Sequence, residues 1–498
     1  MRKALLFLLA AATAAPFVYA DEYSTPGTKQ SYTFTSLSQI SESGVTKNGN
    51  EFTIANDITI SATDTLTIEN NAILKLGPKV QILVEGVGNF APADTATIMS
   101  LDEADGAKGL RYSGDNASGL VKNICFETTA LLSYATNGMT IENCTFNKAN
   151  GVLNSTGAIS FGPSKNNVVR NCRFIEGTIP AIGTGANIAA GVIMEDCYLF
   201  DNNTENANKP QINLTTPAEN GPTIVRNNTI IGNKRLKVGG ISIANMLGLG
   251  MGEVIVEGNL VQDHRYGMQA MGAMEILIKD NQFIDNRYET NPMSGGSALS
   301  ITDSTGKLKC MVTGNLFSGS IWGITAIGQK DGWDSLNLGK VEDRAAADFN
   351  PGGNVFKDNG NDGKNYDPTT PYDLYNNSTL TIYAQGNTWS VPEQTEAEIE
   401  KVIFHKNDNA ALGEVIFMPA GNAGVGNVTV DGSVYFDGKN QTLCSAEMML
   451  DVNLFNMQGM AIMRASDVSS VDLSKLPKGI YVAVVKTGKG TERIKFVK

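Results

Sequence analysis

VRNCRF (residues 169–174), VRNNTI (225–230) and IKDNQF (278–283) are three copies of one short pattern in a chain of 498 residues. In each copy an apolar residue is followed by a polar one, then by Asn or Asp, then by a Cys or Asn that we call the anchor. Another apolar residue follows two positions after the anchor. Related hexapeptides, some with Gly before the anchor, are VKNICF (121–126), IENCTF (141–146), MEDCYL (194–199), VEGNLV (256–261), VTGNLF (312–317) and AQGNTW (384–389).

The distance between anchors varies while the pattern around each anchor does not. The steps are 20, 28, 25, 31, 31, 22, 34, 39 and 33 residues, and the anchors are Ile124, Cys144, Cys172, Cys197, Asn228, Asn259, Asn281, Asn315, Asn354 and Asn387. A constant core with variable spacers predicts the coils of a solenoid, because each coil must stack on its neighbours while the loops at a corner can lengthen freely.

The alternation of the pattern has a period of two, so the anchor and its apolar neighbours should point inward. Asparagine anchors on coils about 4.8 Å apart can then bond to one another and to the backbone of the next coil. Cys144, Cys172 and Cys197 occupy the same column, and we expect them to be small buried side chains rather than a disulfide or a metal site.

Composition limits the class of protein. Residues 1–20 combine a basic pair, a short apolar run and small residues, as in a cleaved signal peptide, and we expect no transmembrane segment. The net charge of −12 argues against a nucleic-acid partner. Six scattered cysteines do not form a disulfide scaffold. A soluble, exported and turn-rich β protein fits these features.

The repeat resembles the right-handed parallel β-helix of the pectin-lyase-like family, and this resemblance covers about residues 34–419. We therefore expect an all-β fold: a right-handed single-stranded parallel β-helix over residues 21–420, with N-terminal opening coils and a C-terminal capping helix. For the cap we expect a capping box of Thr395 and Glu398, and Ile399, Val402 and Ile403 on one helical face.

The C-terminal segment has a different pattern. A Gly-rich and Ala-rich linker (421–428) precedes residues 429–498, where LFNMQG (454–459), DLSKLPKGIYVAVV (472–485) and a basic end resemble the C-terminal sorting domain of the type IX secretion system. Alternating apolar residues predict a small antiparallel β-sandwich. The resemblance implies a Bacteroidota source, the type IX secretion machinery as a partner, secretion across the outer membrane, and a cell-surface or extracellular location.

The stretch VQDHRYG (261–267) contains one of only two histidines. Asp263, His264 and Arg265 could form a catalytic centre, but His264 is five residues after its anchor, where other coils have Asn202, Asn233 and Asn286. The pattern therefore favours a turn role over general acid–base chemistry. The catalytic candidates that stay open are Asp263, His264, Arg265, Asp285 and Arg287.

Positions six and seven after the anchor suggest a binding strip. Stacked coils would align basic and aromatic side chains there, in a column that could hold acidic sugars; the candidates are Lys234, Arg265, Tyr266, Arg287, Tyr288 and Trp322. Packing of these rings for stability alone is the alternative. Lyases of the same family hold calcium between clustered aspartates, so calcium is the one cofactor to test, with Asp263 and Asp285 as its candidate ligands.

Three functions remain open. The first is a surface-displayed, non-catalytic and monomeric protein that binds a glycan or a host surface, or is structural. The second is a polysaccharide lyase or glycoside hydrolase acting on acidic polysaccharide, although the hydrolase motifs of the family are missing. The third is a stalk without a specific ligand. Two long insertions, 200–222 and 328–375, could shape a pocket.

Overall fold

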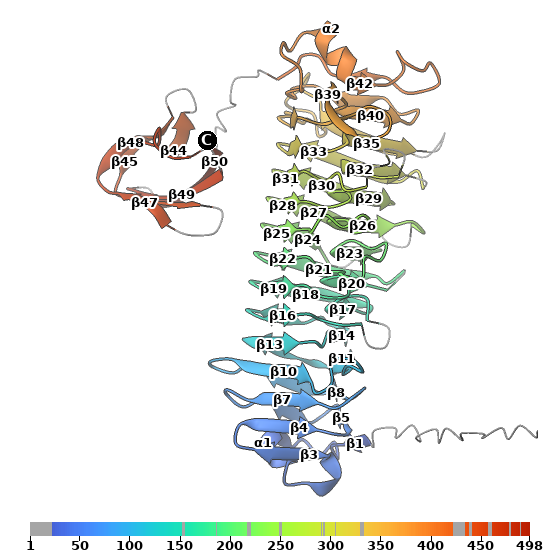
Figure 1. Cartoon of the computed structure of the whole chain (residues 1–498), viewed down its shortest axis with the longest axis vertical. Helices are drawn as coiled ribbons and strands as arrows, with labels where there is room; N and C mark the ends of the chain where they lie inside the picture. The colour runs from blue at the N-terminus through green and yellow to red at the C-terminus, as the bar shows by residue number, and fades with distance from the viewer. Residues whose placement is uncertain are drawn as a thin grey trace, which may run out of the picture. The chain divides into compact units, whose positions relative to one another are not determined.

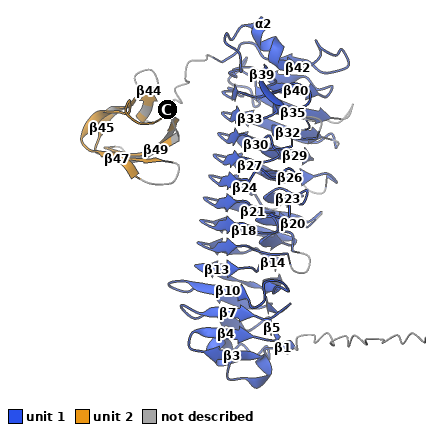
Figure 2. Cartoon of the chain, in the orientation of Figure 1, with its two compact units in different colours: residues 1–421 blue, residues 422–498 orange. Residues whose placement is uncertain are grey.

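The structure is a computed structural model of the whole chain. It describes residues 22–421 and 434–498, except 152–154, 186, 217–220, 249–250, 290, 292–293, 304, 329–332, 438–440, 457–460, 478–479 and 489. The chain forms two compact units, residues 1–421 and 422–498 (Figure 2). The predicted signal peptide and residues 422–428 of the predicted linker lie outside the described residues. Among those residues, no helix is long and apolar enough to cross a membrane.

The first unit is a stack of coils whose strands form three long sheets (Figure 1). Sheet A contains β1 (Glu22–Ser24), β5 (Asp57–Ile60), β8 (Gln81–Val84), β11 (Gly109–Gly114), β14 (Leu131–Ala135), β17 (Ile159–Phe161), β20 (Ile182–Thr184), β23 (Ile212–Thr215), β26 (Ile241–Asn245), β29 (Met268–Gly272), β32 (Ser297–Asp303), β35 (Trp322–Gly328), β40 (Leu374–Asn377) and β42 (Ile403–Phe404).

Sheet B contains β2 (Ser31–Thr33), β6 (Thr65–Thr67), β9 (Val87–Phe90), β12 (Ser118–Lys122), β15 (Thr140–Glu142), β18 (Ser164–Arg170), β21 (Ala190–Glu195), β24 (Thr223–Arg226), β27 (Glu253–Glu257), β30 (Met274–Lys279), β33 (Leu308–Thr313), β36 (Trp333–Gly339), β41 (Ile382–Ala384) and β43 (Val415–Ile416).

Sheet C contains β3 (Val45–Asn48), β4 (Glu51–Ile54), β7 (Ile73–Leu76), β10 (Ala96–Ser100), β13 (Ile124–Glu127), β16 (Thr145–Asn147), β19 (Arg173–Ile175), β22 (Tyr198–Phe200), β25 (Thr229–Ile231), β28 (Leu260–Gln262), β31 (Gln282–Ile284), β34 (Leu316–Ser318) and β37 (Val355–Lys357). Through the repeat each coil runs from B to C to A, and its strands pair in parallel with those of the next coil. The predicted parallel β-helix is confirmed.

A single residue turns the chain from sheet B to sheet C, and its backbone explains the residue before the anchor. Asn143, Asn171 and Asn227 have φ of 54°, 53° and 55°, and Gly258 and Gly314 have φ of 66° and 67°. This left-handed region is open to glycine and tolerated by Asn and Asp, whose short side chains bond locally. The sequence preference at this position is therefore a backbone requirement.

The asparagine anchors form the predicted ladder. Asn281 is representative: its Oδ1 accepts from the backbone N–H of Asn259 at 3.0 Å and from its Nδ2 at 2.9 Å, while its own Nδ2 donates to the backbone oxygen of Val256 at 2.8 Å. The same contacts recur between Asn228 and Asn259, and in the pairs Asn281–Asn315, Asn315–Asn354 and Asn354–Asn387. Each buried amide is thus satisfied by the coils on either side of it.

Cys144, Cys172 and Cys197 continue this column as buried free thiols, as predicted. The backbone N–H of Cys172 donates to the Cys197 sulfur at 3.4 Å, so the sulfur takes the place of an amide oxygen. Beside them the rings of Phe126 and Phe146 stack with centroids 4.5 Å apart. The anchor column therefore stays buried and packed in the coils before Asn228, where cysteine takes the place of asparagine.

The ends of the β-helix are closed by short helical segments: α1 (Phe34–Leu37) and η1 (Ser41–Ser43) at one end, α2 (Glu396–Ile399) and η2 (Glu400–Val402) at the other. Ile399, Val402 and Ile403 are buried, as expected. The predicted capping box is wrong, because the Thr395 side chain makes no capping hydrogen bond and Glu398 pairs with Lys401 at 2.5 Å.

The second unit is an antiparallel pair of sheets with a core of its own. One sheet has three strands, β44 (Val434–Asp437), β45 (Thr442–Met449) and β48 (Val468–Asp472); the other has four, β46 (Asp451–Asn456), β47 (Ala461–Ala465), β49 (Ile480–Thr487) and β50 (Gly490–Val497). Cys444 is on β45, as a strand residue expected from the sequence to be buried, but it is only half-buried. The predicted antiparallel sheets are confirmed.

Candidate functional site

The corner where each coil passes from sheet C to sheet A holds every candidate residue except Trp322. Asp201, Asp263, Asp285 and Asp358, each four residues after an anchor, have φ between 49° and 64°. These aspartates therefore form a left-handed turn, which is a structural role. The residue five positions after the anchor points inward, and it is buried at Asn202, His264, Asn286, Ser320 and Asn359.

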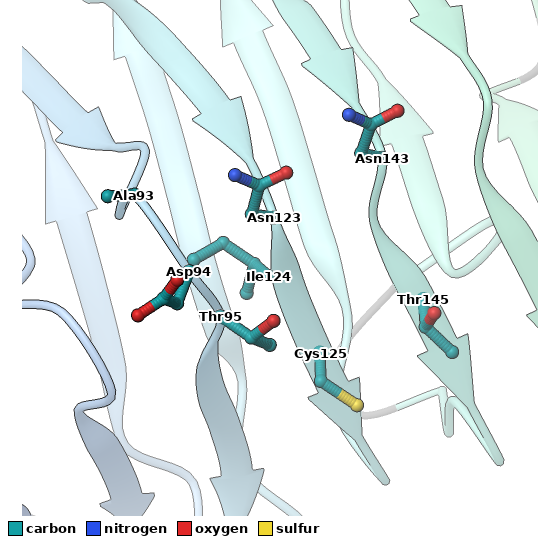
Figure 3. Close-up of a pocket in the computed structure, with 8 residues that line it drawn as sticks. All are labelled: Ala93, Asp94, Thr95, Asn123, Ile124, Cys125, Asn143 and Thr145. Carbon is teal, nitrogen blue, oxygen red and sulfur yellow. The ribbon is translucent and has the colours of Figure 1, made fainter.

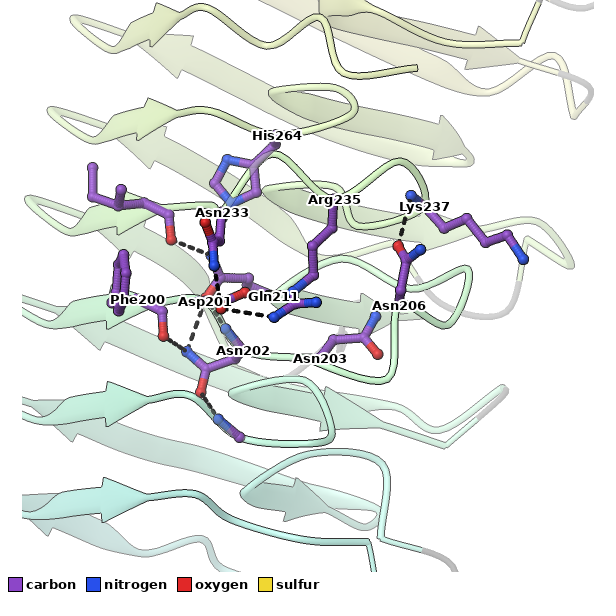
Figure 4. Close-up of polar contacts among 12 residues, drawn as sticks. Phe200, Asp201, Asn202, Asn203, Asn206, Gln211, Asn233, Arg235, Lys237 and His264 are labelled. Carbon is purple, nitrogen blue, oxygen red and sulfur yellow. Dashed lines mark hydrogen bonds and ion pairs between the residues drawn. The ribbon is translucent and has the colours of Figure 1, made fainter. Parts of the chain in front are cut away.

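His264 is sealed in this second column, with 1% of its surface exposed. Its backbone N–H donates to Asn286 Oδ1 at 3.1 Å. The amide nitrogen of Gln211 lies 2.8 Å from the Nε2 of His264 (Figure 4). Gln211 Oε1 accepts from Asn202 Nδ2 at 2.8 Å, so the atom of Gln211 that faces the His264 ring is its amide nitrogen, which must donate. The imidazole is therefore neutral, with its proton on Nδ1.

Burial lowers the pKa of His264 to about 3. A general base must reach its substrate and have a pKa near the working pH. His264 lacks both properties, so its geometry fits a structural role.

Asn233 does not join the column, which corrects the sequence prediction. It is exposed, and its Nδ2 donates to Asp201 Oδ2 at 2.8 Å. Arg235 also holds Asp201, with Nε and Nη2 at 2.5 Å and 2.8 Å from its two carboxylate oxygens (Figure 4). Gln211, from the insertion at 200–222, fills the inward place instead and bonds to the backbone oxygen of Ile231 at 2.8 Å.

Arg265 and Tyr266 are also tied to the fold. Arg265 donates to Asn208 Oδ1 at 2.7 Å and to the backbone oxygen of Ser294 at 2.6 Å. Tyr266 is 6% exposed and packs on Gly239, where a Cβ atom would lie 2.1 Å from its ring. Its expected place in an exposed strip is wrong, because the missing side chain of Gly239 opens an internal space for the ring.

Lys234, Tyr288 and Asp263 form an outward-facing cluster. The Tyr288 hydroxyl donates to Asp263 Oδ1 at 3.1 Å, and Lys234 Nζ lies 5.6 Å from the centroid of the Tyr288 ring. Contact with Tyr288 raises the pKa of Lys234, while burial and then Asp263 raise the pKa of Tyr288. Both groups keep their protons at neutral pH, which suits the binding of an anion rather than the removal of a proton.

Arg287 forms the second outward-facing cluster. Its Nη1 pairs with the Asp285 carboxylate and donates to the backbone oxygen of Gly319 at 2.7 Å, while its guanidinium carbon lies 4.3 Å from the ring centroid of Tyr366. Tyr366 comes from the insertion at 328–375, and sequence reasoning missed it because no repeat aligns there. Its pairing with Arg287 repeats the cation and ring arrangement of Lys234 and Tyr288.

Trp322 does not belong to this corner strip. Its ring centroid lies 4.6 Å from that of Tyr372 and 5.1 Å from that of Tyr375, and Tyr375 contacts Phe404 at 5.1 Å. This second aromatic cluster is on the strands of sheet A near the cap. The predicted column of six residues is therefore divided between the core, the corner and the end of sheet A.

The residues present do not fit a calcium site. Calcium needs several oxygen ligands that converge on one point. The Asp285 carboxylate is paired with Arg287, and that of Asp263 accepts from Tyr288 and faces Lys234. Over the described part of the chain, no group of three or more His, Cys, Asp or Glu side chains could hold a metal ion.

A polar hollow of ≈ 460 Å³ continues the same corner across the preceding coils. It carries charges of both signs and is lined by Glu103, Thr128, Lys148, Asn150, Glu176, Thr178, Asp201, Thr204 and Arg235. Hydroxyl, amide and charged groups of this kind bind sugar hydroxyls and carboxylates. Sequence reasoning missed it because its residues come from six coils with unequal spacers.

Another hollow, of ≈ 370 Å³, lies beside the turns from sheet B to sheet C and includes Asp94, Asn123, Asn143 and Cys125 (Figure 3). Burial and a hydrogen bond to Glu127 raise the pKa of the Cys125 thiol to about 12. The thiolate is the nucleophilic form of cysteine. Cys125 is therefore an inert thiol, and this hollow offers no catalytic group of that kind.

Comparison with known families agrees with both units. Residues 115–283 match the family model of the right handed beta helix region, and residues 431–498 match the secretion system C-terminal sorting domain. The chain is a right-handed parallel β-helix protein with a type IX sorting domain. That domain implies the secretion machinery as a partner and export to the cell surface or extracellular space.

Solved structures with a similar fold include a double mutant of the periplasmic alginate epimerase AlgG, with a TM-score of 0.50 and 10% identity over 78% of this chain and 83% of that one. Tailspike protein 3 of bacteriophage CBA120 has a TM-score of 0.43 and 12% identity over 80% of this chain and 63% of that one. At such identity the epimerase likeness shows the fold alone. No curated protein matches the sequence significantly.

Proposed function

We propose that this exported β-helix is a non-catalytic surface protein that binds an acidic glycan or an anionic host surface through the corner between sheets C and A. The observation that carries the proposal is the pairing of a cation with a ring that lies two coils further along the β-helix, Lys234 with Tyr288 and Arg287 with Tyr366. A ring can stack on a sugar face while the cation pairs with a carboxylate or sulfate.

The same corner argues against turnover. Among the catalytic candidates His264 is sealed from solvent, Arg265 is fixed by Asn208 and Ser294, and Asp285 is neutralised by Arg287. The remaining carboxylate, Asp263, accepts from Tyr288 rather than from a second acid. Hydrolysis of a glycosidic bond needs two carboxyl groups with distinct roles. Of the two candidate carboxylates here, only Asp263 is not paired with an arginine.

Affinity electrophoresis in gels containing alginate, pectate or neutral dextran tests the binding proposal. We expect the acidic polymers to retard the parent protein, and the double variant Lys234→Ala with Arg287→Ala to bind roughly tenfold more weakly because two charge contacts are lost. Lys165→Ala, an exposed lysine at the start of β18, is the matched control. Equal retardation of parent and double variant would remove the corner as the binding site.

The enzyme alternative is tested with alginate, pectin and glycosaminoglycans in the presence of calcium, by the absorbance of unsaturated products and by reducing ends. We expect no turnover. Turnover that disappears in His264→Ala or Arg265→Ala would establish a lyase or hydrolase instead.

The proposal also includes the expected processing of the chain. A signal peptide at residues 1–20 would be removed on export from a Bacteroidota cell, and residues 421–428 would link the β-helix, 21–420, to the sorting domain, 429–498. The intact mass of the exported protein tests both points, since it gives the first and last residues of the mature chain.

A further inference from the structure

The outer face of sheet B carries an uninterrupted aliphatic stripe. On six successive coils the same outward position is occupied by an aliphatic side chain that is only half-buried, and these residues are Val168, Ile193, Ile224, Ile255, Leu277 and Met311. They are in register from strand to strand. Contiguous apolar side chains on an outer face mark a surface for interaction.

Beside the stripe, two residues further along each strand, the charge alternates from coil to coil. The register aligns Lys122, Glu142, Arg170, Glu195, Arg226, Glu257 and Lys279 in one column of alternating sign. Neighbours along this column form ion pairs, for example Arg170 with Glu142 at 2.9 Å and Arg226 with Glu195 at 2.6 Å. This face is therefore nearly neutral in a chain whose net charge is −12.

Such a column is complementary to itself. If a second copy meets the face through a two-fold axis that runs along the strands and between two coils, every coil faces one of opposite charge. An axis passing through a coil would instead bring like charges together. Several axes between coils satisfy the charges. Only the axis between the coils of Ile224 and Ile255 also places an aliphatic residue of the second copy opposite each of the six aliphatic residues.

The geometry points to sheet B as the interface of an antiparallel homodimer with this two-fold axis. Ile224 then meets Ile255 of the second copy, Ile193 meets Leu277, and Val168 meets Met311. Arg226 faces Glu257, and Glu195 faces Lys279. The sequence prediction of a monomer rested on the inward positions and the corner, and the outward positions of sheet B did not enter it.

The size of the face sets the strength of the dimer. Six coils about 4.8 Å apart and strands of about six residues give a face of roughly 24 Å by 20 Å, or about 500 Å² per copy. That area is at the lower limit for specific interfaces, so we expect micromolar association. Display at high density on a cell surface would favour such a contact.

Sedimentation velocity of the full mature chain tests the dimer. We expect the parent to dimerise at about 10–100 µM. Arg226→Glu places two like charges opposite each other and should weaken the dimer at least roughly tenfold, as should Glu257→Arg. An equimolar mixture of the two variants should associate again, since each then presents the charge that the other lacks. Arg173→Glu, a charge reversal on sheet C, is the matched control.

Ile255→Thr weakens the stripe without a new charge and serves if the charge variants do not fold. A photo-crosslinker at position 255 identifies the occupant directly. We expect a product of twice the chain mass, linked to β24. A parent that stays monomeric over this range, a mixture that fails to associate, or a crosslink to residues 434–498 of the same chain would each overturn the proposal.

Discussion

His264 should make the β-helix sensitive to acid, and replacing it with Asn should remove that sensitivity. Burial holds its pKa at about 3, below the ordinary value of 6.5. In the unfolded chain the ring takes up a proton as the pH falls below 6.5, whereas in the folded chain it does not until about pH 3. The stability contributed by His264 is therefore lost progressively over this window as the pH falls.

The size of the effect follows from the two pKa values. A pH of 5 is 1.5 units below the pKa of the ring in the unfolded chain. At roughly 1.4 kcal/mol per unit, protonation then stabilises the unfolded chain by about 2 kcal/mol. At pH 7 the effect is close to zero. Because Asn occupies the equivalent place at residues 202, 286 and 359, His264→Asn keeps the column and removes the titration.

Urea unfolding followed by tryptophan fluorescence reports on the β-helix and not on the C-terminal unit, because Trp322, Trp333 and Trp389 all lie in the β-helix. The free energy of unfolding of His264→Asn, relative to the parent, should rise by about 2 kcal/mol between pH 7 and pH 5. Asn286→Ser, a neutral change in the same column, should show a difference that does not depend on pH. A relative stability of His264→Asn that is equal at both pH values would refute the buried neutral imidazole.

Three further outcomes are expected in urea unfolding. Burial raises the pKa of Asp373 to about 6, so the carboxyl takes up a proton in the folded protein before it does in the unfolded chain, and the free energy of unfolding rises as the pH falls from 7 towards 4. In Asp373→Asn this rise, up to about 3 kcal/mol, should be absent. Asn281→Ala should cost about 3 kcal/mol, since the backbone N–H of Asn259 and one hydrogen of its Nδ2 lose their acceptor and the Val256 carbonyl loses a donor; an unchanged midpoint would contradict the ladder. Asn171→Val should cost roughly 1–2 kcal/mol at φ 53° while Asn171→Gly is tolerated, and equal losses would contradict a backbone cause.

The coil could be predicted from the sequence because each of its requirements is local and repeated. The left-handed turn needs Asn, Asp or Gly before the anchor, and the ladder needs an amide at the anchor, so Asn227 and Asn228 carry both signals in adjacent letters. Loop length does not disturb either requirement. The unequal spacing of the anchors therefore hid nothing about the fold.

The corner could not be predicted in the same way because its contacts come from the spacers. Gln211 replaces Asn233 in the inward column, Asn208 binds Arg265, and Tyr366 covers Arg287. None of the three has a fixed distance from an anchor. Aligning the repeats gives each residue a position on the coil. It does not show that a residue from a loop, such as Gln211, fills an inward position instead of the aligned residue.

Tyr266 and Tyr288 show how much one coil can differ from the next. Both are seven residues after an anchor, yet Tyr266 is buried over Gly239 while Tyr288 lies outside between Lys234 and Asp263. Core packing fixes the inward places on every coil, so variation in ligand chemistry can occur only where a side chain turns outward. The outward places of the corner and of sheet B differ in this way. The corner places cations beside rings, and sheet B places alternating charge beside aliphatic residues.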